Sequence, residues 1–218
     1  ITGAATNLVV DPANTNDLVR ITSEWFTYLG DSAIFNENVV VEDGEDRLTC
    51  EKLKIEFQQP GGVQKIEAID QVHLAQRDTE VTSGHALYDL AENTIRVTGE
   101  PKWQSGLREG SAELLLLNRS NNTLFAEGEV YMKLPLTNVV DETVQQATNN
   151  FIEIYSDRFT YTEAPDTNTP AGAVYEGHVR AEHPEGEIRC EILNIRFAPG
   201  DNRLGRVEAE REVGIIAK

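Results

Sequence analysis

The side chains of this sequence that could bind a metal ion lie near its C-terminal end. His178, Glu182, His183 and Glu185 fall within eight residues, and imidazole and carboxylate groups are common zinc ligands. The run crosses a Pro-Glu-Gly turn sequence, so an exposed acidic turn explains the same residues. We therefore predict no metal site and no cofactor.

The sequence contains none of the local motifs that identify common enzyme classes. We find no Gly-x-Ser-x-Gly nucleophile elbow, no phosphate-binding glycine loop, no dinucleotide fingerprint and no histidine motif for a catalytic metal. Scattered carboxylates leave one enzymatic alternative, a glycosidase that uses a carboxylate pair within a β-jellyroll. We predict that the protein is not an enzyme and has no catalytic residues.

The net charge of the chain excludes a further class of function. Its 218 residues include 37 acidic and 19 basic side chains, which gives a formal charge of −18. Such a field has the wrong sign for nucleic acid and for an anionic membrane surface, so we predict no nucleic-acid partner. No apolar run approaches the ~20 residues of a membrane-spanning helix.

The elements that must position any site are short alternating segments rich in β-branched and aromatic residues. Clusters of glycine, proline and asparagine separate them every ten to twenty residues, which is typical of antiparallel strands. Within 48–57 the apolar residues switch from even to odd positions between Cys50 and Leu53. Such a strand keeps its apolar side chains inward only if it bulges or bends there. The sequence therefore predicts an all-β fold whose sheet turns a corner.

The chain repeats itself. With an offset of 140, residues 33–57 align without gaps to 173–197, and nine of these 25 positions are identical. We predict a domain over 1–134, a connector over 135–149 with a short helical candidate at 141–147, and a second, partial copy over 150–218. This second copy lacks counterparts of the strands from 81 to 134, so its half-sheet must be covered by another sheet or stay exposed.

The two cysteines occupy equivalent positions of this repeat. Cys50 and Cys190 must then lie about one domain apart, far beyond the Cα separation of about 4.4–6.8 Å that a disulfide requires. We predict two free thiols that act as small buried hydrophobic groups.

The strand motifs together resemble a known family. In order, the chain carries Asn38-Val-Val-Val41, Leu48-x-Cys50-x-x-Leu53-x-Ile55-x-Phe57, Pro60-Gly-Gly62, Ile66-x-Ala68, Gly84-His-Ala-Leu-Tyr88, Ile95-x-Val97-x-Gly99 and Ala126-x-Gly128-x-Val130. This order and spacing is similar to the OstA/LptA-type family of lipopolysaccharide transport, which includes LptC and the N-terminal part of LptD. The resemblance covers about residues 20–134 and, weakly, 150–218.

The resemblance implies a β-jellyroll of antiparallel strands that forms a V-shaped sandwich in the periplasm of a Gram-negative-type bacterium. It implies a non-catalytic carrier or bridge that binds lipopolysaccharide or a related glycolipid through its acyl chains and serves outer membrane biogenesis. It also implies docking to other jellyroll proteins of the transport bridge through edge strands, or a head-to-tail homo-oligomer. The present chain departs from the smallest members of the family by its second, incomplete copy.

The apolar strand positions are the candidate lining of a lipid groove. We predict that it is lined by Leu48, Leu53, Ile55, Phe57, Ile66, Val72, Leu74, Ile95, Val97, Leu114, Leu116, Leu124, Val130 and Met132. Each of these residues taken alone is also explained as ordinary core. Because basic residues are few and not clustered, we expect binding to the lipid tails rather than to the phosphorylated headgroup.

Two other kinds of function remain open. The chain could be a structural β module that assembles by strand addition through edges at 22–28 and 124–134. It could also be a carbohydrate-binding jellyroll, but Trp25 and Trp103 are its only tryptophans and supply few stacking surfaces.

Overall fold

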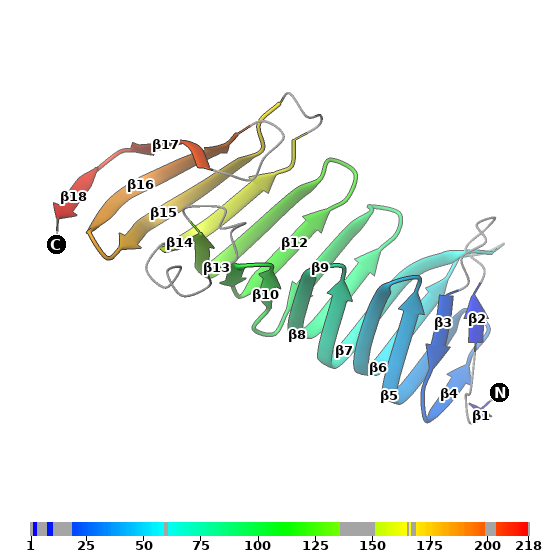
Figure 1. Cartoon of the computed structure of the whole chain (residues 1–218). Coiled ribbons are helices and arrows are strands. Elements are labelled where there is room, and N and C mark those ends of the chain that lie inside the picture. Colours follow the sequence, from blue (N-terminus) through cyan, green and yellow to red (C-terminus); the bar gives the residue numbers. More distant parts are fainter. Residues whose placement is uncertain are drawn as a thin grey trace. The chain divides into compact units, whose positions relative to one another are not determined.

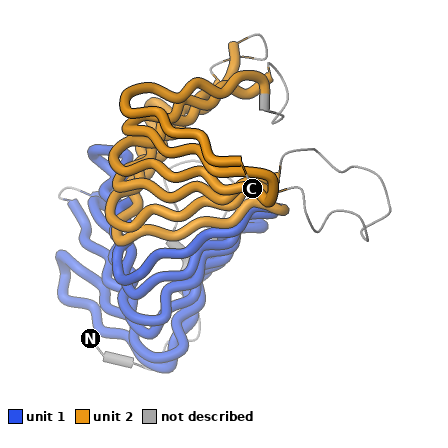
Figure 2. Tube along the Cα trace, turned by 90° about the vertical axis from the view of Figure 1, so that its left-hand side faces the viewer, with its two compact units in different colours: residues 1–106 blue, residues 107–218 orange. Residues whose placement is uncertain are grey.

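The structure is a computed structural model that describes residues 2–3, 8–10, 19–58, 61–135, 151–164, 166, 169–198 and 204–217. Every helix or strand assigned in these ranges is a β-strand, and neighbouring strands pair antiparallel (Figure 1), which confirms the predicted all-β fold. These ranges hold no helix able to cross a membrane. The chain forms two compact units, residues 1–106 and 107–218 (Figure 2), which we describe separately.

Unit 1 is built on four long strands with short strands on either side. Its strands are β1 (Thr2–Gly3), β2 (Leu8–Val10), β3 (Val19–Thr22), β4 (Trp25–Tyr28), β5 (Ser32–Asp43), β6 (Asp46–Phe57), β7 (Val63–Gln76), β8 (Thr79–Asp89), β9 (Thr94–Thr98) and β10 (Lys102–Ser105). Strands β3 and β4 pair with opposite halves of β5, and β10 and β9 pair with opposite halves of β8. Each half of the long strands therefore belongs to a different sheet.

The long strands of unit 1 change sheet where their pairing register shifts. The shift lies between Asn36 and Val39 in β5 and between Ile69 and Val72 in β7. In β6 it lies between Thr49 and Lys52, so the bend that we predicted beside Cys50 is confirmed. The bulged residues Glu37 and Asn38 of β5 and Asp70 and Gln71 of β7 have positive φ angles, a geometry that polar residues such as asparagine and aspartate tolerate better than β-branched ones.

Unit 2 has the same plan of four long strands. Its strands are β11 (Arg108–Ser111), β12 (Leu114–Asn118), β13 (Thr123–Pro135), β14 (Phe151–Thr162), β15 (Gly172–His183), β16 (Gly186–Phe197), β17 (Leu204–Glu210) and β18 (Gly214–Ala217). Strands β11 and β12 pair with opposite halves of β13, and β18 and β17 pair with opposite halves of β16. The predicted connector lies, apart from Pro135, outside the described residues.

The repeat seen in the sequence has the same register in both units. Ala33 pairs with Ile55 in the β5–β6 hairpin, and Ala173 pairs with Ile195 in β15–β16. The amide of the closing phenylalanine donates to a carbonyl in each copy, from Phe57 to Asp31 at 2.8 Å and from Phe197 to Ala171 at 3.0 Å. A tandem duplication and the domain boundaries drawn from it stay predictions.

The two edges that we predicted for strand addition are not edges. Residues 124–134 belong to β13, which pairs with β11 and β12 on one side and with β14 on the other. Residues 22–28 lie in β3 and β4, which pair with β5 and, on the other side, with β2 and β1. Strand β13 also covers the half-sheet of the second copy. Hairpins can be read from sequence, but pairing between distant segments cannot, and this is why the edges were misplaced.

Candidate functional site

The site with the clearest geometry is an apolar cleft between the two sheets of unit 1. Its volume is about 270 Å³. It is lined by Val19, Val41, Asp43, Asp46, Arg47, Leu48, Ile66, Ala68, Val72, Leu74, Val81, Ser83, Ala86, Tyr88, Ile95 and Val97. Both sheets contribute, so the cleft lies between their inward faces.

The strand register explains why these side chains meet. In one sheet, Val41 pairs with Leu48, Leu48 with Leu74, and Leu74 with Val81, which gives one continuous apolar row. Residues paired across antiparallel strands lie on the same face of the sheet, so all four side chains of this row point toward the interior.

Small side chains keep this cleft open. In the opposite sheet Ala68 pairs with Ala86, and both line the cleft beside Ile66 and Ile95. A methyl group at each position reaches less far into the interior than the leucine or phenylalanine found elsewhere in the core. The sheet interior therefore retains space for a ligand at this point instead of closing by side-chain contact.

The polar groups of the cleft lie mostly at one turn. Asp43, Asp46 and Arg47 flank the β5–β6 turn, and Asp46 accepts a hydrogen bond of 2.6 Å from Gln76. Tyr88 donates its hydroxyl proton to Asn93 at 3.1 Å. The remaining lining is almost wholly aliphatic, so the arrangement suits a hydrocarbon ligand with a polar group near the turn.

The predicted lining residues divide into three groups. Leu48, Ile66, Val72, Leu74, Ile95 and Val97 line the cleft. Leu53 and Ile55 are buried in the core of unit 1, and Phe57 packs against that core. Leu124, Val130 and Met132 share the inward face of β13 in unit 2, where Val130 and Met132 are buried. Contact of any of these residues with a lipid stays a prediction.

Leu114 and Leu116 need a correction. They share a face of β12, whereas Leu115 on the opposite face is buried and pairs with the buried Ala126. In β12 the side chains at odd-numbered positions, such as Leu115, therefore point inward, and Leu114 and Leu116 point outward. Four consecutive leucines show no alternation, so the sequence offered no basis for choosing between the two faces.

Sequence reasoning missed Val41 and Val81 as lining residues. Both pair with a residue that had been named, Val41 with Leu48 and Val81 with Leu74. The signal was present, because each pair closes a tight hairpin at 44–45 or 77–78 whose turn fixes the register.

The cysteine and histidine side chains do not form a reactive or metal-binding site among the described residues. Cys50 and Cys190 are free and buried, as predicted, and burial raises the pKa of the Cys50 thiol to about 11. His178 Nδ1 lies 2.8 Å from a carboxylate oxygen of Asp157 on the neighbouring strand. Within the described part of the chain, no three His, Cys, Asp or Glu side chains are placed to hold a metal ion together.

One protein-family model agrees with the motifs read from the sequence. The family model described as LptA/(LptD N-terminal domain) LPS transport protein matches residues 21–123, from β3 to the first residue of β13. The resemblance to the OstA/LptA-type family is thereby confirmed over this segment. Comparison with curated proteins found no match.

A similar solved structure is LptH of Pseudomonas aeruginosa, described as the LptA homologous periplasmic component of the conserved lipopolysaccharide transport device. The TM-score is 0.46 at 14% sequence identity, and the match covers 60% of this chain and 87% of that one.

Proposed function

We propose that this chain, whose residues 21–123 match the LptA/(LptD N-terminal domain) family of LPS transport proteins, carries lipopolysaccharide or a related glycolipid through the periplasm toward the outer membrane. The observation that carries the proposal is the apolar cleft between the sheets of unit 1. In this function the protein acts by binding and release, without catalysis and without a cofactor.

The energetics of burying an acyl chain support a carrier of this kind. Each methylene removed from water contributes about 0.8 kcal/mol, so a chain of about a dozen methylenes gains on the order of 10 kcal/mol before ordering costs. The cleft volume of about 270 Å³ is slightly smaller than the roughly 300–1,000 Å³ that is typical of small-molecule sites. The cleft therefore suits one acyl chain at a time.

The charge of the protein favours recognition of the tail over the headgroup. Arg47 is the one basic side chain among the residues that line the cleft, and it lies beside Asp46 and close to Asp43. The chain as a whole carries a net charge of −18, which repels the phosphates of a lipid headgroup. Affinity must then come from hydrocarbon burial, and it should depend weakly on salt.

Photocrosslinking from adjacent residues on opposite faces of one strand tests the proposal. A photoreactive amino acid at Leu74 or Val81, which line the cleft, should crosslink lipopolysaccharide. The same group at His73 or Thr82, which point away from the cleft on the same strands, is the matched control. Equal crosslinking from the two sets would refute a carrier function for this cleft.

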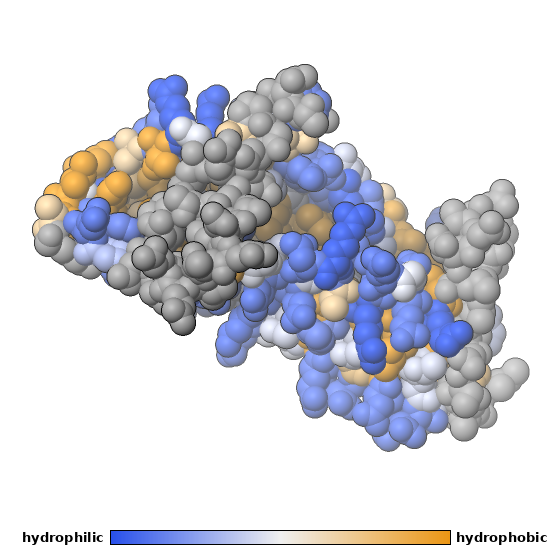
Figure 3. Space-filling model, in the orientation of Figure 1, coloured by the Kyte–Doolittle hydropathy of each residue, from blue (hydrophilic) through white to orange (hydrophobic). Residues whose placement is uncertain are grey.

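A second property, assembly into a bridge, is favoured by the sheet edge of unit 2 that β17 and β18 form. Strands β17 and β18 have no further neighbour among the described residues, and Figure 3 shows apolar atoms gathered over them. Ile215 in β18 is 77% exposed although it pairs with Ile188 of the inward face. We propose that this edge accepts a strand from another jellyroll protein or from a second copy of the chain.

Sedimentation over a range of concentrations tests the assembly. Ile215→Lys should weaken self-association or binding of an LptA-type partner, because a charge replaces an apolar contact. Leu107→Lys, which changes an exposed residue outside β17 and β18, is the control. If both variants behave like the parent chain, the β17–β18 edge is not the docking surface.

A further inference from the structure

The apolar cleft of unit 1 ends in a row of polar side chains. Asp43 pairs with Asp46 across the β5–β6 turn, and Asp46 accepts a hydrogen bond of 2.6 Å from Gln76. Gln76 pairs with Thr79, and the Thr79 hydroxyl donates to Ser105 at 2.9 Å. Of these five residues, only the two aspartates are charged.

Both aspartates lie on the face of the sheet that lines the cleft. Val41 and Leu48 line the cleft, and they stand two residues before Asp43 and two residues after Asp46. Because side chains alternate across a strand, the two carboxylates share the inward face with these aliphatic residues. The aliphatic lining therefore continues directly into a pair of carboxylates.

The two ends of the cleft differ in their exposure to solvent. Beside the bend, Ala68, Val72 and Val97 are 2%, 3% and 8% exposed. At the opposite end Asp43 is exposed and Asp46 is half-buried. A polar group keeps its hydration only at the exposed end, so an amphiphile binds with its tail toward the bend and its head at the aspartates.

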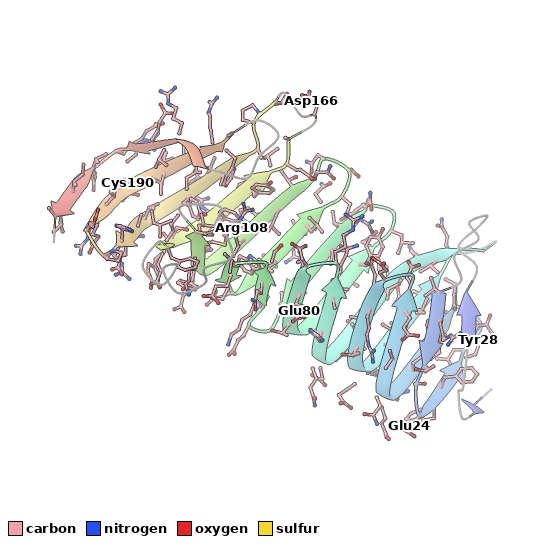
Figure 4. All side chains as sticks on the ribbon, viewed as in Figure 1. Glu24, Tyr28, Glu80, Arg108, Asp166 and Cys190 are labelled. Atoms are coloured by element: carbon pink, nitrogen blue, oxygen red, sulfur yellow. The ribbon has the colours of Figure 1, made fainter. Side chains whose placement is uncertain are left out.

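The side chain of Arg47 is directed away from these aspartates. It precedes the inward Leu48 and pairs with Glu42, so it lies on the outward face of the sheet. The same outward row contains Glu80 of β8, labelled in Figure 4, whose side chain is 65% exposed. Among the residues that line the cleft, the inward charges are therefore both negative.

The fold does not require carboxylates at these two positions. With the offset of 140, His183 occupies the place of Asp43 and Gly186 the place of Asp46, and these two residues pair in the β15–β16 hairpin. Like charges directly opposite each other destabilise a pair of strands. Unit 1 thus keeps an unfavourable pair that unit 2 lacks, and a ligand of opposite charge accounts for it.

From this arrangement we infer that the cleft of unit 1 selects amphiphiles whose head carries a protonated amine over those that end in a phosphate or a carboxylate. Asp43 and Asp46 are the specificity-determining residues. An ammonium group between them forms charge-assisted hydrogen bonds and relieves their mutual repulsion, whereas an anion adds a third negative charge. The inference rests on the proposed carrier function of this cleft and adds the chemistry of the head to it.

Displacement of the uncharged dye N-phenyl-1-naphthylamine tests the selection. The competitors are dodecylamine, dodecanol and dodecyl phosphate below their micelle concentrations, which share one tail length and differ in the charge of the head. Dodecylamine should displace the dye at a concentration roughly tenfold lower than dodecanol, and dodecyl phosphate should require a higher concentration than dodecanol.

Neutral substitutions at the turn separate a local effect from the net charge of the chain. Asp43→Asn combined with Asp46→Asn should remove most of the preference for dodecylamine and leave dodecanol unchanged, and asparagine still offers Gln76 an acceptor. Glu42→Gln combined with Glu45→Gln is the matched control, because it removes the same charge from the same turn but outside the inward face. At physiological ionic strength this control should change the preference by less than about twofold.

Equal effects of the two pairs of substitutions would overturn the inference, since the preference would then come from the net charge of −18. Asp43→Asn alone keeps the test valid if the double variant fails to fold, because Asp43 is exposed. It should lower the preference for dodecylamine severalfold. An unchanged preference in a folded Asp43→Asn chain would also contradict the selection.

Ala86→Phe distinguishes failure of this inference from failure of the carrier function. The larger ring fills the cleft, to whose lining Ala86 contributes, so dye binding should be lost. Dye binding that persists in this variant would refute the cleft as a binding site, and the selection with it. Dye binding that is lost in this variant, together with equal displacement by the three competitors in the parent chain, would refute the selection alone.

Discussion

Unit 1 and unit 2 pack their hairpins in the same way but bury different chemistry. The pairs Phe35–Leu53 and Tyr175–Leu193 occupy the same register, and all four side chains are buried. Beside this shared core, unit 1 leaves an aliphatic cleft, whereas unit 2 places a phenol and a guanidinium. The comparison teaches that the inward apolar pattern sets the backbone register, while very few residues change the chemistry of each interior.

The outer side of the bends shows a similar contrast. In unit 1 the amide of Asn38 donates to Glu24 at 3.3 Å, and at the equivalent place in unit 2 His178 lies 2.8 Å from Asp157. Ser23 and Ser156 each donate to the carbonyl two residues on, at 3.0 and 2.9 Å. The bend is thus held by the same kind of contact in both units, but only the one in unit 2 can titrate near neutral pH.

The largest expected effect tests whether the two cores are equivalent. Leu53→Ala and Leu193→Ala each remove a side chain that is 1% exposed, and each should lower the free energy of unfolding by about 3–5 kcal/mol. Urea unfolding followed by far-UV circular dichroism measures both. A loss below about 1 kcal/mol in one unit alone would mean that the core of that unit collapses around the cavity and that the two interiors differ in rigidity.

Alanine substitutions of one glycine in each unit should lower stability by different amounts. A Cβ atom at Gly99, where φ is +79°, would lie 2.9 Å from the backbone of Gly84, so Gly99→Ala should cost about 3 kcal/mol. A Cβ at Gly177, with the same φ, would meet only the side chain of Asp157, which can move, and Gly177→Ala should cost about 1–2 kcal/mol. Thermal unfolding of the two variants side by side measures the order, and the reverse order would contradict this account.

Much of the fold could be predicted from local patterns. The apolar parity slip beside Cys50 predicted the bend of β6, and the gapless repeat predicted a second hairpin with the register of the first. Both signals survive because side-chain alternation is a property of a single strand. The pairing of β13 with β14 had no such signal, because the segment 136–150 separates the two strands in the sequence. The register of two strands joined by such a connection depends on tertiary packing.

The candidate site was harder to predict than the fold. Inward parity identified Leu48 and Leu74, but parity cannot tell a residue that faces a cleft from one, such as Leu53, that is closed into the core. That difference arises because Ala68 pairs with Ala86 on the neighbouring strand, so that two small side chains lie together. Such a combination depends on the pairing of two strands and cannot be seen in either strand alone.

Exchanging one hydroxyl between the units sharpens the comparison further. Tyr175→Phe removes a donor without a partner among the described residues and should raise the free energy of unfolding by about 1 kcal/mol. Phe35→Tyr places a hydroxyl in the aliphatic interior of unit 1 and should lower it by about 1–3 kcal/mol. Urea unfolding without ligand measures both changes. Destabilisation by Tyr175→Phe would show that this hydroxyl is satisfied within the protein.

The smallest expected effect concerns the titrating contact at the bend of unit 2. The hydrogen bond and the charge of Asp157 raise the pKa of His178 above its ordinary value of 6.5. Because the folded-state pKa is the higher one, the stabilisation from this pair is fully present below the unfolded-state pKa and is lost as pH rises through the folded-state pKa. A proton NMR titration of the imidazole should show the raised pKa, and Asp157→Asn should return it toward the ordinary value.

At the equivalent bend of unit 1, Asn38 carries no proton to titrate, so Glu24→Gln should leave the pH dependence of stability unchanged. A His178 pKa that is the same with and without the Asp157 carboxylate would show that the two side chains do not pair in solution.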